Sequence, residues 1–235
     1  MKIEIYTIPL KEGFEKNSEC PFCAMKQALE VKNTEYFLSP AYMEEEIRDE
    51  TNRYGFCNPH LEKLAASRNV LGVSLMMQSL LMTRRQALNE TLSSVAREKK
   101  AAKQEALWKA FDEPKNTCAI CRRIDATMER YTEAFFFLWK KEKEFRETVF
   151  PGKGFCLEHF SGLYQAADRY LSGSAADEFK KLLAEREEAE LSRMQEDLDW
   201  FIKKFDYRFA NEPWKNAKDA LPRALLKLNG IYPSE

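Results

Sequence analysis

Six cysteines and two histidines are the residues of this sequence best suited to chemistry, and they form two similar sets. The first set is Cys20, Cys23, Cys57 and His60. The second set is Cys118, Cys121, Cys156 and His159. In each set a Cys-x-x-Cys pair is followed by a Gly-Phe-Cys-x-x-His segment. Three thiolates and an imidazole are the ligands of a Cys₃His zinc site, so the sequence predicts two Zn²⁺ ions per chain.

The spacing within each pair also fits metal binding. Residues three apart at the start of a helix lie on one face of its first turn. Helix N-termini carry unpaired N–H groups and a partial positive charge, which favour thiolates. If the two helices after each Cys-x-x-Cys pair form an antiparallel hairpin, the chain returns to its starting point. We therefore expect each set to bind its own ion.

Other roles for the cysteines are weaker alternatives. The two Cys-x-x-Cys pairs could be redox couples, the thiols could be small buried apolar groups, and an iron–sulfur cluster has related ligands. None of these explains why each pair has a Cys-x-x-His partner at nearly the same distance. With the ligands complete, a zinc ion has no open position for catalysis, and both histidines are already used. The sequence therefore favours structural metal sites over an enzyme.

Bulk properties narrow the classes of protein further. The 235 residues include 37 basic and 38 acidic side chains, giving a formal charge of -1, so no electrostatic attraction to nucleic acid or anionic lipid is expected. The N-terminal segment has charges throughout and does not resemble a signal peptide. The apolar run at 70–82 is too short to span a membrane. We expect a cytoplasmic protein with reduced thiols and no membrane segment.

Glycine and proline positions divide the chain into helices, which predicts an all-α fold. We expect two tandem four-helix repeats, each made of an α-hairpin and two further helices and closed by its zinc site. The predicted domains are 1–113 for the first repeat, 114–212 for the second and 213–235 for a C-terminal helical tail. A short extended arm or strand is expected around Ile3–Thr7.

The expected helices follow this division. In the first repeat they cover 21–38, 41–53, 59–69 and 73–111. In the second they cover 119–137, 140–149, 158–171 and 175–207. The break between the expected helices 119–137 and 140–149 is not marked by glycine or proline, because neither residue occurs from Ala119 to Phe150. An unbroken helix there would carry Cys156 far from Cys118, so closing the second site predicts a reversal near 137–141.

The duplicated motif resembles an uncharacterised bacterial family, a domain of unknown function. The resemblance rests on the eight ligands and on the Gly-Phe pairs that precede Cys57 and Cys156. It covers most of the chain. It implies a bacterial cytoplasmic protein and supplies no activity.

Three kinds of function remain in view. The first is a non-enzymatic, zinc-stabilised scaffold that binds another protein or a small effector. The second is a zinc–thiolate redox or metal sensor. The third is a nucleic-acid-binding regulator, disfavoured because acidic residues are interleaved near the basic residues at 84–103. An enzyme would need a cleft with perturbed carboxylates.

Two apolar segments have their own alternatives. The run Ala134–Trp139 reads as helix core, with a ligand pocket as the alternative. The stripe Leu191, Met194, Leu198, Phe201 and Phe205 reads as an amphipathic helix docked on the body. A partner-binding or homodimer seam is its alternative.

Overall fold

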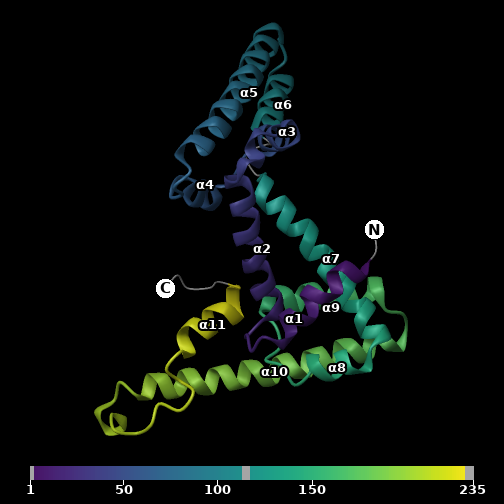
Figure 1. Ribbon diagram of the computed structural model, residues 1–235, viewed down its shortest axis with the longest axis vertical. Helices are drawn as coiled ribbons and strands as arrows, with labels where there is room; N and C mark the ends of the chain where they lie inside the picture. The colour runs from purple at the N-terminus through teal and green to yellow at the C-terminus, as the bar shows by residue number, and fades with distance from the viewer. Residues whose placement is uncertain (1–2, 113–116, 231–235) are drawn as a thin grey trace. The chain divides into compact units, whose positions relative to one another are not determined.

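The computed structural model describes residues 3–112 and 117–230, and within these ranges the chain forms helices and no strands (Figure 1). The all-α prediction is confirmed. The α-helices are α1 (Thr7–Glu15), α2 (Pro21–Leu38), α3 (Glu45–Tyr54), α4 (Asn58–Ala65), α5 (Val70–Arg97), α6 (Ala101–Asp112), α7 (Ala119–Lys141), α8 (Lys143–Val149), α9 (Leu157–Tyr170), α10 (Ser174–Lys203) and α11 (Ala220–Asn229). Short 3₁₀ helices are η1 (Ile3–Tyr6), η2 (Pro40–Met43) and η4 (Tyr207–Phe209).

The chain divides into two compact units. One, here the split unit, consists of residues 1–27 and 128–235, and the other, the inserted unit, is Ala28–Thr127. Helices α2 and α7 each have residues in both units. The predicted repeat boundary at 113–114 lies outside the described residues, so the division into tandem repeats stays a prediction.

The core of the split unit is aromatic. Phe135 of α7 is fully buried, and rings from α1, α2, α8 and α10 surround it at centroid distances of 5.6 to 6.0 Å. Trp139, one turn further along α7, is 7% exposed and stacks on Phe135. Burial of this apolar surface removes it from water, which is the main driving force for packing α7 here. The segment Ala134–Trp139 is therefore mainly core, as predicted.

In the inserted unit, α3 packs against α5, and α5 packs against α6. Helix α5 ends at Arg97, and Glu98 has an extended backbone, whereas the sequence predicts one helix over 73–111. The Gln104 side chain donates hydrogen bonds to the carbonyls of Val95 and Glu98, which satisfies groups freed by the break. The prediction of a single helix is wrong because no glycine or proline marks this turn.

The two ends of the described chain are helical. Ile3–Tyr6 forms η1 and Thr7 begins α1, so the prediction of an extended arm or strand is wrong. The predicted C-terminal helix is present as α11. Pro222 lies in its first turn, where a missing N–H costs nothing, and the helix begins there rather than being kinked.

A reversal occurs between α7 and α8, where Glu142 has an extended backbone. It lies one residue beyond the predicted range of 137–141. Arg146 of α8 donates hydrogen bonds to the carbonyls of Trp139 and Lys140, so its guanidinium caps the end of α7. This local cap replaces the glycine or proline that usually ends a helix.

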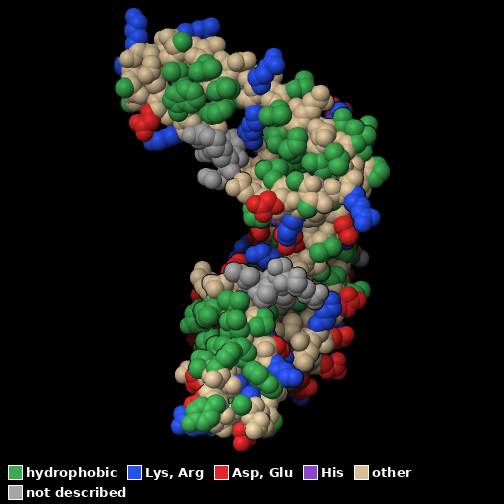
Figure 2. Space-filling model, turned by 90° about the vertical axis from the view of Figure 1, so that its left-hand side faces the viewer, with side chains coloured by type: hydrophobic (Ala, Val, Ile, Leu, Met, Phe, Trp, Pro, Cys, Tyr) green, Lys and Arg blue, Asp and Glu red, His purple; other side chains and the backbone are tan. Residues whose placement is uncertain are grey.

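Apolar side chains are also found on the surface. Figure 2 shows them gathered in patches on the face that it presents. In the inserted unit, Val70, Leu71, Leu81 and Met82 of α5 are each more than two-thirds exposed. No helix among the described residues is both long enough and apolar enough to cross a membrane.

Candidate metal centres

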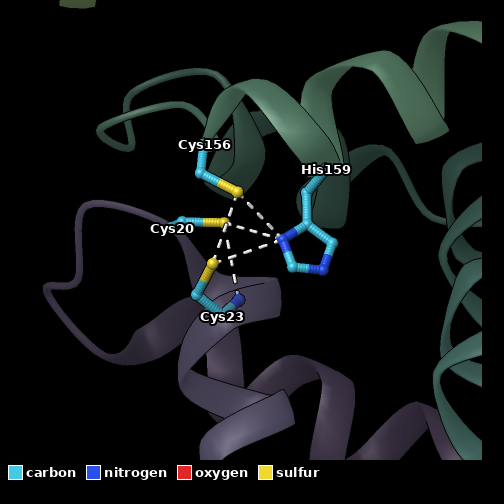
Figure 3. Close-up of side chains that lie close together, drawn as sticks. All are labelled: Cys20, Cys23, Cys156 and His159. Atoms are coloured by element: carbon cyan, nitrogen blue, oxygen red, sulfur yellow. Dashed lines mark hydrogen bonds between the residues drawn. The ribbon is translucent and has the colours of Figure 1, made fainter. Parts of the chain in front are cut away.

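The eight predicted ligands form two clusters, but the pairing differs from the prediction. Cluster 1 consists of Cys20, Cys23, Cys156 and His159 (Figure 3). Cluster 2 consists of Cys57, His60, Cys118 and Cys121. In each cluster the four ligand atoms lie within 4.8 Å of one another. The expectation that each sequence repeat closes its own site is therefore wrong, because each Cys-x-x-Cys pair meets the Cys-x-x-His segment of the other set.

The error lies in the assumed hairpin. Helix α2 has 18 residues and is about 27 Å long, whereas α3 has 10 residues and covers about 15 Å. Helix α3 also packs against α5. It cannot bring Cys57 back along the whole of α2, so Cys57 meets Cys118 in the inserted unit instead. Cluster 1 lies wholly within the split unit, and cluster 2 lies wholly within the inserted unit.

In cluster 1 the imidazole Nδ1 of His159 faces the three thiols (Figure 3). It lies 3.6 Å from Cys20 Sγ, 3.3 Å from Cys23 Sγ and 3.1 Å from Cys156 Sγ. The Sγ atoms of Cys23 and Cys156 are 3.4 Å apart. All three cysteines are buried. The site is thus compact, with its sulfur atoms shielded from water and His159 partly exposed.

Cluster 2 has nearly the same geometry. His60 Nδ1 lies 3.1 Å from Cys57 Sγ and 3.4 Å from the Sγ atoms of Cys118 and Cys121. The Sγ atoms of Cys57 and Cys121 are 3.8 Å apart. Cys118 is buried, but Cys57 and Cys121 are partly exposed. Cluster 2 therefore exposes two of its thiols in part, whereas the partly exposed member of cluster 1 is the imidazole of His159.

These distances fit a tetrahedral zinc site. With Zn–S bonds of about 2.3 Å and Zn–N bonds of about 2.0 Å, a tetrahedron has edges of roughly 3.5 to 3.8 Å. The observed separations of 3.1 to 3.8 Å lie at or slightly below these edges. Soft sulfur and imidazole ligands in this geometry suit zinc better than magnesium or calcium. The ligands present are therefore those that a structural zinc ion takes.

The titration of the thiols reflects their burial and their closeness to one another. Burial, together with Cys156, raises the pKa of Cys20 to about 12. In cluster 2, burial raises the pKa of Cys118, but hydrogen bonds from His60 and the backbone outweigh it and lower that pKa to about 6. Burial and the neighbouring thiolate raise the pKa of Cys121. Thiolates this close repel one another, and a divalent cation would offset that repulsion.

Helix starts position all four ligand pairs. Helices α2, α4, α7 and α9 each begin directly after the first cysteine of a pair, and the second ligand lies in the first turn. The N–H of Cys23 donates to Cys20 Sγ at 3.4 Å, and the N–H of Cys121 donates to Cys118 Sγ at 3.5 Å. The predicted use of helix N-termini is confirmed by these bonds.

The histidines have different outer partners. His60 Nε2 lies 3.3 Å from the carboxylate of Glu30, which in turn pairs with Lys63 at 2.6 Å. His60 Nε2 makes no hydrogen bond, so Glu30 places a negative charge beside the ring without fixing its tautomer. The ring of His159 instead lies against Phe22, with centroids 5.5 Å apart. Cluster 2 therefore has a polar outer shell on its histidine, and cluster 1 an apolar one.

A buried lysine holds the segment before Cys156. Lys227 of α11 is fully buried, and its ammonium donates to the carbonyls of Lys153 and Phe155. It also lies 3.4 Å from Glu187 of α10, whose other carboxylate oxygen accepts the N–H of Phe155 at 3.0 Å. The backbone leading into Cys156 is thus fixed from both α10 and α11. A buried lysine beside a site with three thiolates also supplies positive charge.

A second set of buried charges ties the two ligand segments of cluster 1 to α10. Glu19, directly before Cys20, is 4% exposed. It accepts Arg193 at 2.5 Å and lies 3.4 Å from the ammonium of Lys153. Arg223 of α11 lies 3.7 Å from Glu19 as well. These ion pairs link the chain before Cys20 to the chain before Cys156.

The two glycines before the Cys-x-x-His segments have left-handed backbones, and their surroundings differ. Gly55 has φ of 60°, and its carbonyl accepts the N–H of Ala119 at 2.9 Å. Gly154 has φ of 70°. The residue of α2 that corresponds to Ala119 is Pro21, which has no N–H to donate. In cluster 1 the Lys227 and Glu187 contacts fix this turn instead.

These outer-shell residues were not identified from the sequence. Glu30, Glu187 and Lys227 look like ordinary charges on polar helices, and nothing in their spacing shows that Glu187 and Lys227 are buried or that Glu30 lies beside a histidine. Glu19 carried a usable signal, because it precedes the first ligand directly.

Comparison with known proteins confirms the resemblance to a family of unknown function. A model described as a family of unknown function, DUF6062, matches residues 1–235. The chain belongs to this family. It is also similar to an uncharacterised 23.9 kDa protein in the xynA 3′ region of Caldicellulosiruptor sp. (strain Rt8B.4), with 25% identity over 194 residues, covering 82% of this chain and 85% of that protein. No solved structure matches this member of DUF6062.

Proposed function

We propose that this protein is a scaffold in which two structural zinc ions hold sequence-distant helices together, and that it binds another protein or a small effector. The observation that carries the proposal is the presence of two complete Cys₃His clusters in separate units. Each cluster uses four protein ligands, which leaves no open position for a catalytic water. A reducing cytoplasm would keep these thiols available for metal.

Each ion would join segments that lie far apart in the sequence. The ligands Cys23 and Cys156 are 133 residues apart, and Cys57 and Cys121 are 64 residues apart. Cross-links that close long loops restrict the unfolded chain most, so metal binding at these positions contributes to folding. Structural zinc is the role for which this arrangement is best suited.

The metal content tests this proposal. Protein purified without chelator or added metal should contain two zinc ions per chain by elemental analysis, and mild peroxide should leave both in place. A zinc content near zero in folded, reduced protein would overturn it.

Exposure at cluster 2 supports a second candidate, a zinc–thiolate redox sensor. Cys57 and Cys121 are partly exposed, with Sγ atoms 3.8 Å apart. A hydroperoxide could take two electrons from this pair, forming an S–S bond as peroxide is reduced to water and alcohol or water alone. The zinc ion would then leave. Zinc release at stoichiometric peroxide, with a change in circular dichroism, would favour the sensor over the scaffold.

A further inference from the structure

A pocket in the split unit lies outside both metal clusters. It is formed by the end of α7, by α8 and by the first half of α10, and its volume is about 650 Å³. Sites for small molecules typically have volumes of roughly 300 to 1,000 Å³. Trp139 and Phe179 form part of its floor, with ring centroids 5.0 Å apart, and Phe150 lies 5.2 Å from Trp139. The floor is therefore aromatic and held rigidly by the core.

The rim of the pocket is charged, with an excess of cations. Lys140, Lys143 and Arg146 line it, opposed by Glu147 and Glu178. Lys143 pairs with Glu147 at 3.2 Å. Lys140 donates to the carbonyl of Tyr170. Arg146 donates to the carbonyls of Trp139 and Lys140, and its guanidinium lies over the Trp139 ring, 5.5 Å from the centroid. Carbonyl contacts leave the positive charge at the rim in place.

We propose that this pocket binds a small organic anion with an apolar body, of the class of aromatic or medium-chain carboxylates. The apolar body would cover the Trp139 and Phe179 floor, and the carboxylate would lie at the rim near Lys140 and Arg146. Burial of the body supplies most of the affinity, and the charge fixes its orientation. This inference rests on the scaffold proposed above, since it names the class of its effector.

The position that best tests the pocket is Ala175, which lines its mouth from α10 and is exposed. An Ala175→Trp substitution adds an indole without removing a core side chain. Ala189, also exposed on α10 and absent from the pocket lining, supplies the matched control, Ala189→Trp. The probe is 8-anilinonaphthalene-1-sulfonate, an aromatic anion whose fluorescence rises in apolar sites.

We expect the wild type and Ala189→Trp to bind the probe at one saturable site, and Ala175→Trp to bind it more than about tenfold more weakly, a loss of about 1.4 kcal/mol. Unchanged probe binding in Ala175→Trp would overturn the proposal. Because Ala175→Trp could disturb folding, its circular dichroism is compared with that of the wild type. A second measurement on the wild type alone does not depend on this variant.

That measurement is competition. Decanoate should displace the probe, and decyltrimethylammonium, with the same chain and the opposite charge, should displace it much less. Lys140→Gln should weaken decanoate binding roughly two- to fivefold, as expected for one exposed charge. Equal displacement by both ligands would refute an anion site. Zinc content is measured on the same samples. A failure of the metal proposal, seen as absent zinc, is thereby distinguished from a failure of the pocket proposal, seen as absent anion binding.

Discussion

At the scale of single residues, cluster 1 is held in position by side chains that are not themselves members of the cluster. Lys227 is the clearest of them, because its ammonium is fully buried and holds two carbonyls next to Cys156. A buried ammonium is tolerated only when its donors are satisfied and a counter-charge is near. Glu187 is that counter-charge.

Replacing this lysine should therefore affect both stability and metal binding. Lys227→Met leaves Glu187 buried without its cation, so we expect the free energy of unfolding to fall by about 3 to 5 kcal/mol. Zinc should also leave cluster 1 more readily, which a chelator titration would show. The measurements are urea unfolding and zinc affinity.

The matched control is Lys181→Met. Lys181 also pairs with a glutamate of α10, Glu185, but both side chains of this pair are largely exposed. It should change the unfolding free energy by less than about 0.5 kcal/mol. Adding Glu187→Gln to Lys227→Met should recover part of the loss, since it removes the unpaired carboxylate. If Lys227→Met behaves like the control, the lysine does not position the site.

The ligands themselves were predictable from the sequence, and their pairing was not. Eight residues of the right types with equal spacing in two sets are sufficient to identify two sites. The pairing depends on how far α3 returns along α2, which is decided by its packing against α5. No local pattern at Cys57 carries that information, because both possible partners are Cys-x-x-Cys pairs at helix starts.

At the scale of elements, the helical segments were well predicted, and the positions at which helices end were predicted less well. Helix α2 has the predicted bounds, because Pro21 and Ser39-Pro40 mark both of its ends. The ends of α5 and α7 are marked instead by side chains from the next helix, Gln104 and Arg146. The reversal at Glu142 was predicted for the wrong reason. The prediction assumed that Cys156 must return to Cys118, but these two residues belong to different clusters.

The turn before α9 provides the next prediction. A Cβ atom at Gly154 would lie 2.8 Å from a Glu187 carboxylate oxygen and 3.2 Å from the Lys227 ammonium, at a φ of 70°. Gly154→Ala should therefore lower the free energy of unfolding by at least about 1 to 2 kcal/mol. Thermal unfolding in the presence of zinc measures this change.

Gly162 is the matched control, because it lies within α9 and an added Cβ meets no atom within 4 Å. Gly162→Ala should stabilise the protein by up to about 1 kcal/mol through helix propensity. Opposite signs for the two substitutions are expected. A stabilising Gly154→Ala would show that the turn relaxes freely and that its contacts do not constrain it.

At the scale of the whole molecule, the two metal clusters should differ in lability. The cysteines of cluster 1 are buried, and Gly230 at the end of α11 lies against its sulfurs, since a Cβ there would be 3.4 Å from Cys23 Sγ. Cluster 2 exposes part of Cys57 and Cys121. A chelator should therefore remove zinc in two phases, with cluster 2 losing its ion first.

Ligand variants assign the phases. Cys121→Ser should abolish the fast phase and leave one slowly released zinc per chain, and Cys156→Ser should abolish the slow phase. A colorimetric zinc indicator follows the release. A single phase in the wild type, or a fast phase that survives Cys121→Ser, would contradict the assignment.

The interruption of the split unit by the inserted one sets an order for biosynthesis. As the chain leaves the ribosome, cluster 2 is complete at Cys121, whereas Cys20 and Cys23 wait for Cys156 and His159. The gap of 133 residues between Cys23 and Cys156 corresponds to on the order of 10 s of translation. During that time the first Cys-x-x-Cys pair is an unpaired dithiol on a nascent chain, open to oxidation or to capture of the wrong metal. The cluster whose first two cysteines are made first is therefore the last to close.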